Sequence, residues 1–182
     1  HILFLEAVGK KNKPVILSTG LGTLSEVSLA IEALKRGGGE KLPITILQCT
    51  SEYPAPPDEM NINVIKAYRS LFNLPVGLSD HSSGIEASIA AVALGSSVIE
   101  KHFTIDRKMD GPDHSASLNP NELKEFVVLL RRVEIMLGDG NKQPTKSEIK
   151  NITGIRRSIV ASESLKAGVI LKSDNIVCKR PG

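Results

Sequence analysis

Tryptophan is absent from the sequence, and aromatic residues make up only 3% of its 182 residues. A platform of stacked aromatic side chains, on which single-stranded nucleic acids bind, is therefore not expected. Lys and Arg number 23 against 20 Asp and Glu, and the basic residues are dispersed along the chain. This balance is too mild to indicate a basic surface for nucleic acid or membrane. No apolar run reaches the length of a membrane span.

Cysteine is also scarce, since Cys49 and Cys178 are the only two and lie far apart without the spacing of a metal or redox motif. Such thiols are typical of a reducing compartment, so we expect a cytoplasmic protein. Cys49 ends an apolar run, which indicates a core residue and not a nucleophile. The chain begins at His1 instead of Met, and we therefore expect a further segment upstream of it.

Four apolar runs rich in β-branched residues alternate with helical segments. The runs occupy residues 14–20, 43–49, 75–79 and 96–102. Helix starts are indicated by capping-box spacing at Thr23–Glu26 and Ser83–Glu86, and by Asn119 before Pro120. Strict alternation of this kind predicts an α/β fold with a parallel sheet. Four such units fit either an open doubly wound sheet or half of an eight-stranded barrel.

The ends of the four runs distinguish these two folds. The first run is followed by residues 18–22, which lack the third glycine of a dinucleotide-binding fingerprint. Polar residues instead follow or end every run: Ser18, then Ser51 with Tyr53, then Ser79 with His81, then Glu100 with His102. Chemistry spread over the carboxyl ends of all strands favours the (β/α)8 barrel.

Two of these strand ends carry a histidine. Because alternate residues of a strand share a face, Ser79 points with His81, and Glu100 points with His102, whereas Lys101 points the opposite way. If the two strands are parallel neighbours, both imidazoles emerge at the same rim beside carboxylates. This set of side chains can bind a divalent metal ion. A single histidine at a strand end is more often structural, and the paired placement is what favours a metal site.

The composition changes after the fourth unit. Residues 1–138 hold the four strand–helix units, and residues 139–155 are expected to be a linker because they open with Gly, Asp and Asn. Short strands are expected within 156–161 and 169–179. So few residues cannot build an independent core, and 156–182 is therefore interpreted as the incomplete beginning of a small β-rich domain.

The sequence resembles the sialic acid synthase family, which includes N-acetylneuraminate, legionaminate and pseudaminate synthases. The similar blocks are residues 13–20 (KPVILSTG), 49–54 (CTSEYP), 77–81 (GLSDH), 99–104 (IEKHFT), 111–114 (GPDH), 156–158 (RRS) and 179–182 (KRPG). The resemblance implies the second half of a (β/α)8 TIM barrel, followed by the start of an antifreeze-like (SAF) domain. It also implies a homodimer that swaps these domains. The GPDH block is more similar to the neuraminate and legionaminate branches than to the pseudaminate branch.

The resemblance further implies a transferase reaction. Phosphoenolpyruvate would condense with water and an N-acyl hexosamine, typically N-acetylmannosamine, to give an N-acetylneuraminate-type acid and phosphate. His81 and His102 would ligate Mn²⁺ or Mg²⁺, and Glu100 on the same face would orient water or an intermediate hydroxyl. The resemblance assigns the remaining contacts as follows: Ser18, Ser51 and Ser79 to phosphoenolpyruvate, Tyr53 and Asp113 to the sugar, and Arg180, supplied by the partner chain, to the N-acyl group. Some relatives carry Asn at the position of Ser51.

Each of these assignments has a structural alternative. Ser18 could simply end a strand, Tyr53 could pack against the proline loop that follows it, and Asp113 could form a turn beside Gly111. Arg180 could be an ordinary surface charge. At the level of the whole protein, two other functions stay open: a different metal-dependent aldolase-type barrel with another acceptor, and a sugar-binding or dimerisation module without chemistry.

In the family, the lysines and the acid that complete the phosphoenolpyruvate site come from the first half of the barrel. The 182 residues of this sequence contain no counterpart of those lysines or of that acid. We therefore predict that the purified 182-residue chain alone forms no product from phosphoenolpyruvate and N-acetylmannosamine, measured as phosphate release. Detectable product would contradict this prediction. A sugar-binding module would instead bind saccharide with an affinity that is indifferent to Mn²⁺ and to phosphoenolpyruvate.

Overall fold

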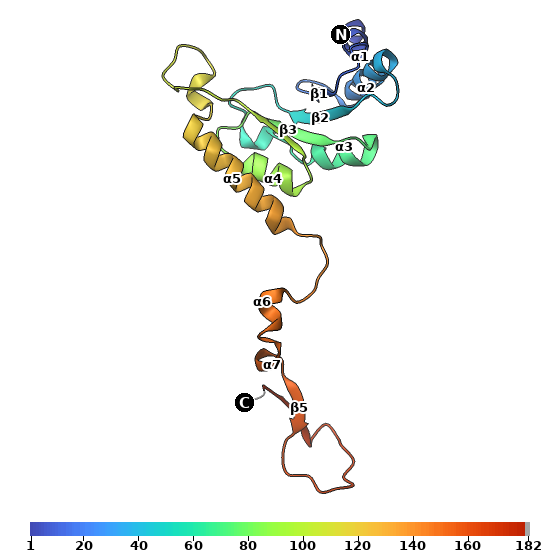
Figure 1. Ribbon diagram of the computed structural model, residues 1–182, viewed down its shortest axis with the longest axis vertical. Helices are drawn as coiled ribbons and strands as arrows, with labels where there is room; N and C mark the ends of the chain where they lie inside the picture. The colour runs from blue at the N-terminus through green and yellow to red at the C-terminus, as the bar shows by residue number, and fades with distance from the viewer. Residues whose placement is uncertain (181–182) are drawn as a thin grey trace. The chain divides into compact units, whose positions relative to one another are not determined.

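The computed structural model describes residues 1–180, and the chain divides into two compact units, His1–Gly138 and Asp139–Gly182 (Figure 1). In the first unit, four strands form one parallel sheet in chain order: β1 (Val15–Ser18), β2 (Ile44–Cys49), β3 (Val76–Asp80) and β4 (Val98–Lys101). The helices of this unit are α1 (Ile2–Gly9), α2 (Leu24–Gly38), α3 (Val64–Phe72), α4 (Glu86–Ala93) and α5 (Pro120–Leu137). The predicted α/β fold with a parallel half-barrel is confirmed.

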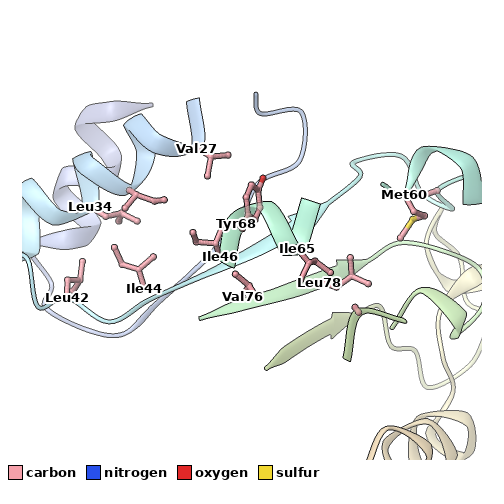
Figure 2. Close-up of a cluster of buried hydrophobic side chains, with 13 residues drawn as sticks. Val27, Leu34, Leu42, Ile44, Ile46, Met60, Ile65, Tyr68, Val76 and Leu78 are labelled. Carbon is pink, nitrogen blue, oxygen red and sulfur yellow. The ribbon is translucent and has the colours of Figure 1, made fainter. Parts of the chain in front are cut away.

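One face of the sheet builds the hydrophobic core together with the helices. Ile44 and Ile46 of β2 and Val76 and Leu78 of β3 alternate along their strands, so that all four side chains point to the same side. Figure 2 shows them packed with side chains of α2 and α3, among them Val27, Leu34, Ile65 and Tyr68. The core therefore lies between the strands and the helices, and the opposite face of the sheet stays available for other contacts.

The capping signals in the sequence were right at two helices and wrong at a third. Thr23 and Glu26 form the predicted capping box of α2, and hydrogen bonds from the Thr23 N–H and hydroxyl lower the pKa of the Glu26 carboxyl. Asn119 caps α5 with Pro120 in the first turn. The capping box expected at Ser83 does not form.

The failed cap at Ser83 has a local cause. The carboxylate of Asp80 accepts hydrogen bonds from the N–H and the hydroxyl of Ser82, which fixes the turn directly after β3. Helix α4 then begins only at Glu86, whose carboxylate accepts the Ile85 N–H.

The second unit is more ordered at its start than the sequence indicated. Residues 139–155, expected to be a linker, contain two one-turn helices, α6 (Lys146–Ile149) and α7 (Ile152–Ile155). A capping box between Thr145 and Glu148 starts α6. The spacing of these two residues in the sequence indicates a helix start, which the linker prediction did not take into account. Strands β5 (Ser158–Ala161) and β6 (Ile176–Lys179) pair antiparallel and are shorter than the segments predicted.

Two single-turn 3₁₀ helices complete the structure, η1 (Pro57–Glu59) and η2 (His114–Ala116), and both lie in loops that follow strands of the first unit. Among residues 1–180, no helix combines the length and the apolar character that crossing a bilayer requires.

The core gives a direct test of which isoleucines stabilise the first unit. Ile46 is 0% exposed, whereas Ile135 on α5 is 80% exposed. We predict that Ile46→Ala lowers the free energy of unfolding by about 2–5 kcal/mol, because it leaves a cavity in the packed cluster. The matched Ile135→Ala change should leave this free energy within about 0.5 kcal/mol of the parent value. Urea unfolding of the chain followed by circular dichroism measures both; equal effects would contradict the core described above.

Candidate active site

The two strand-end histidines lie side by side because of the register between β3 and β4. Ser79 pairs with Glu100 and Asp80 pairs with Lys101 in this parallel ladder, so that His81 and His102 follow at the same level. Their ring centroids are 5.1 Å apart and the ring planes are nearly perpendicular, at 85°. Both side chains are half-buried. The structure therefore brings together the two residues that the sequence singled out as metal ligands.

A third ring joins this pair from the loop after β2. The Tyr53 ring stacks on His102, with centroids 4.0 Å apart and an interplanar angle of 20°, and it meets His81 edge-on at 5.5 Å. The loop is tied to the end of β3, since the Ala55 N–H donates to the His81 carbonyl at 2.8 Å. Tyr53 thus packs against the imidazoles, in addition to its place in the proline-rich loop.

Glu100 lies on the inner face of the sheet together with Ser79, as the strand alternation predicted. The Ser79 hydroxyl, which is almost completely buried, donates to Glu100 Oε1 at 2.7 Å. This hydrogen bond fixes one oxygen of an otherwise exposed carboxylate two residues before His102. Glu100 is therefore held beside the histidine pair.

The other two serines lie at the neighbouring strand ends. Ser18 ends β1 and is exposed, and Ser51 is exposed in the loop after β2. A Cβ atom added to Gly20 would lie only 2.2 Å from Ser51 Oγ, which shows how closely the loops after β1 and β2 approach each other. A larger residue at position 20 would force the Ser51 hydroxyl to move, and both serine hydroxyls stand at the same edge of the sheet as the histidines.

The long loop after β4 returns to the end of its own strand. The Leu118 N–H donates to the His102 carbonyl at 3.0 Å, and Thr104 Oγ1 bonds with His114 Nδ1 at 2.8 Å. This return brings Asp113 Oδ2 to 3.8 Å from His102 Nδ1. Asp113 is more than half exposed, so its carboxylate lies next to the ring cluster while still facing solvent.

Ser117 links this loop to the ring cluster. Its hydroxyl lies 3.3 Å from the Tyr53 hydroxyl and donates to the Asp113 carbonyl at 2.7 Å. Arg107 holds the same residue through its carbonyl at 2.9 Å and also pairs with Glu122 of α5 at 2.8 Å. Sequence reasoning missed Arg107 and Ser117, because neither stands at a strand end.

The residues at the strand ends fit two ligand positions of a divalent metal ion. His81 Nδ1 is buried and has no hydrogen-bond partner among residues 1–180. A buried imidazole nitrogen without a partner requires an explanation, and a bound ion or water supplies one. Within the same residues, no group of three or more His, Cys, Asp or Glu side chains is arranged to hold a metal. A metal ion bound here would take two imidazoles from the described residues and its remaining ligands from elsewhere.

Behind the histidines, on the helix-facing side, lies a pair that the sequence did not reveal. Lys101 Nζ is 3.2 Å from Asp80 Oδ2, and the two side chains are only 4% and 0% exposed. The sequence predicted that Lys101 points away from the histidines, but no local pattern showed its partner. The one feature of the sequence that could have indicated this ion pair is that a charged residue of opposite sign directly precedes each histidine.

Arg180, the residue expected to contact an N-acyl group, belongs to the second unit. It directly follows β6 and is exposed. The last two residues of the KRPG block, 181 and 182, lie outside the described residues.

Comparison with known proteins places these features in a family context. Residues 1–142 match the NeuB family. The chain is 47% identical to N,N'-diacetyllegionaminic acid synthase of Campylobacter jejuni, over 100% of this chain and 54% of that protein. It is 40% identical to pseudaminic acid synthase of the same species, over 98% of this chain and 51% of that protein.

A solved structure is similar as well. The crystal structure of N-acetylneuraminic acid (sialic acid) synthetase from Leptospira borgpetersenii, in complex with citrate, superimposes with a TM-score of 0.75 and 38% identity, covering 83% of this chain and 52% of that one. The chain spans about half the length of the curated relatives that it matches.

The stacking of Tyr53 on His102 can be tested through the proton chemical shifts of the His102 ring. A ring stacked at 4.0 Å shields the imidazole protons, so Tyr53→Ala should move the His102 Hδ2 and Hε1 resonances downfield in NMR spectra. Tyr53→Phe keeps the stack and loses only the hydroxyl contact with Ser117, so it should leave most of the shielding in place. Identical His102 shifts in the parent chain and in Tyr53→Ala would contradict this geometry.

Proposed function

Because the chain belongs to the NeuB family, we propose that it is the second half of the catalytic barrel of a nonulosonic acid synthase. The enzyme would condense phosphoenolpyruvate with an N-acyl hexosamine, such as N-acetylmannosamine, and water. The observation that carries the proposal is the convergence of His81 and His102 beside Glu100 at the ends of two adjacent strands. Two relatives named as legionaminic and pseudaminic acid synthases support the class of product.

The proposed reaction forms one carbon–carbon bond and replaces one carbon–oxygen bond, since the bond to the phosphate oxygen breaks and a bond to the water oxygen forms. The methylene carbon of phosphoenolpyruvate attacks the aldehyde carbon of the open-chain sugar, and the aldehyde oxygen takes up a proton to become a hydroxyl. Water adds to the enolpyruvyl carbon and becomes its keto oxygen. Phosphate leaves with the bridging oxygen and takes the second proton of the water, so that atoms and charges balance.

His81 and His102 fit as ligands of Mn²⁺ or Mg²⁺, with the orphaned nitrogen of His81 as the supporting observation. When bound, such an ion makes the aldehyde carbon more electrophilic. Glu100, fixed by the Ser79 hydroxyl, orients the water that attacks the enolpyruvyl carbon. A carboxylate suits this task because it accepts a hydrogen bond from the water and directs its oxygen.

The substrate contacts follow from the positions of the remaining polar groups. Ser18 at the end of β1 and Ser51 in the loop after β2 present exposed hydroxyls, which suits the anionic groups of phosphoenolpyruvate. The buried Ser79 hydroxyl donates its single proton to Glu100, so the contact with phosphoenolpyruvate expected of Ser79 is left to the other two serines. Tyr53 and Asp113, joined through Ser117, lie together on the loops after β2 and β4 and suit the hydroxyls of a sugar. Phosphoenolpyruvate therefore lies toward β1 and β2, and the sugar toward the loop after β4.

The second unit belongs to the same proposal. Similarity to the legionaminic acid synthase extends over the whole chain and so includes this unit, which we interpret as the start of an SAF domain. In a domain-swapped homodimer, Arg180 would reach the N-acyl group of the sugar in the partner's site, where two N–H groups of its planar guanidinium can both donate to the carbonyl oxygen. The two free thiols, Cys49 and Cys178, suit a cytoplasmic enzyme.

Isotope transfer in the full-length protein tests the reaction. Phosphoenolpyruvate labelled with ¹⁸O at the bridging position is incubated with Mn²⁺ and a panel of N-acyl hexosamines that differ in their acyl and deoxy substituents. The proposal expects phosphate that carries the label, together with a nonulosonic acid from at least one acceptor. Label retained in the organic product, or no consumption of any acceptor, would overturn it. The proposal also expects that a chelator removes the activity and that added Mn²⁺ restores it.

Metal binding separates this function from that of a plain sugar-binding module. We predict that His81→Ala and His102→Ala each weaken Mn²⁺ binding by more than the roughly 10- to 100-fold typical of residues outside the ligand shell. His114→Ala is the matched control, because this imidazole bonds with Thr104 and should leave Mn²⁺ affinity unchanged. Calorimetric titration with Mn²⁺ measures all three. Equal affinity in parent protein and both ligand variants would rule out the metal site.

A further inference from the structure

The ends of β3 and β4 carry two different pairs on their two faces. His81 and His102 lie at the inner face, and the Asp80–Lys101 ion pair lies directly behind them on the helix-facing side. Asp80 and Lys101 are register partners in the parallel ladder, and each immediately precedes one of the histidines in the chain. Successive Cα atoms are about 3.8 Å apart, so the position of the ion pair constrains the stretch of backbone from which each imidazole extends.

The ion pair is held by an almost complete set of hydrogen bonds. The Ser82 N–H and hydroxyl donate to Asp80 Oδ1 at 2.9 and 2.6 Å, and the Ser88 hydroxyl of α4 donates to Oδ2, the oxygen that faces Lys101. Lys101 Nζ donates in turn to the Ser82 carbonyl at 2.8 Å. This network joins β3, β4, the turn after β3 and helix α4 in one rigid unit.

Stability alone does not explain two charges at this depth. Removing a carboxylate and an ammonium from water is costly, and well-packed apolar residues often stabilise a core at least as well. Charged hydrogen bonds differ from apolar contacts in being directional, because each requires a defined distance and angle. The pair is therefore better suited to fixing a geometry than to adding stability.

We propose that Asp80 and Lys101 are positioning residues for the metal-binding histidines. Their ion pair fixes the relative position of the β3 and β4 ends and thereby the separation of the two imidazoles. Metal–ligand distances tolerate deviations of only about 0.2 Å, so a small slip between the strand ends would misplace one ligand. The inference rests on the proposed function to the extent that it takes the two histidines as ligands.

The test is the double variant Asp80→Asn with Lys101→Met in the full-length protein. This variant removes both charges at nearly constant volume and leaves no charge buried alone. We expect Mn²⁺ affinity, measured by EPR titration of free Mn²⁺ well below the melting temperature, to fall by about 10- to 100-fold. The control is Lys35→Met with Glu40→Gln, which removes a lysine–carboxylate pair of the same unit at 3.0 Å and should leave the affinity unchanged.

Each outcome of this titration is decisive. If the parent protein binds Mn²⁺ and the folded double variant binds it equally well, the pair is purely structural and the positioning role is overturned, whatever the change in melting temperature. If the parent protein binds no Mn²⁺, the proposed function fails and the positioning role fails with it.

A second, milder variant keeps the test valid if the double variant does not fold. Ser88→Ala removes one hydrogen bond to the Asp80 oxygen that faces Lys101 and keeps the ion pair. We expect it to weaken Mn²⁺ binding by about fivefold, the usual effect of one hydrogen bond. Unchanged affinity in a folded Ser88→Ala protein would overturn the proposal.

Discussion

The parallel pairing of β3 with β4 is the constraint on which the candidate site depends. One register, with Ser79 opposite Glu100 and Asp80 opposite Lys101, decides which side chains meet. A slip of one residue would exchange the two faces and bury the histidines against the helices. In the observed register, the inner face carries Ser79, Glu100 and the imidazoles, while the helix-facing side carries the ion pair. The candidate site residues and the ion pair behind them therefore lie on opposite faces of the same two strands.

The same division of the two faces holds across the whole sheet, with apolar core side chains on the helix-facing side and polar strand-end residues on the other. Ile46 and Leu78 pack against the helices, where burial of apolar surface stabilises the unit. The opposite face holds the polar residues at the strand ends, and Ile16 is exposed there. The loops after β2 and β4 then close over the strand ends, since Tyr53 reaches His102 and Leu118 returns to the same residue.

Local sequence pattern predicted some features of the fold and of the candidate site correctly, and others could not be predicted from it. Alternation along the strands correctly assigned Glu100 and His102 to one face, and side-chain spacing correctly located the caps at Thr23 and Asn119. The stacking of Tyr53 on His102 and the burial of Lys101 against Asp80 depend on contacts between distant segments, which no local pattern contains. The cap expected at Ser83 failed for a related reason, because Asp80 fixes the turn through Ser82 first.

The proposed function requires both imidazoles to bind one cation. Electron spin echo envelope modulation of Mn²⁺ in the full-length protein, prepared with ¹⁵N-labelled histidine, detects coordinating nitrogens directly. If both histidines bind the ion, the spectrum shows two ¹⁵N couplings of similar size, one of which disappears in His81→Ala and the other in His102→Ala. A Mn²⁺ spectrum without any histidine nitrogen coupling would contradict the proposed function.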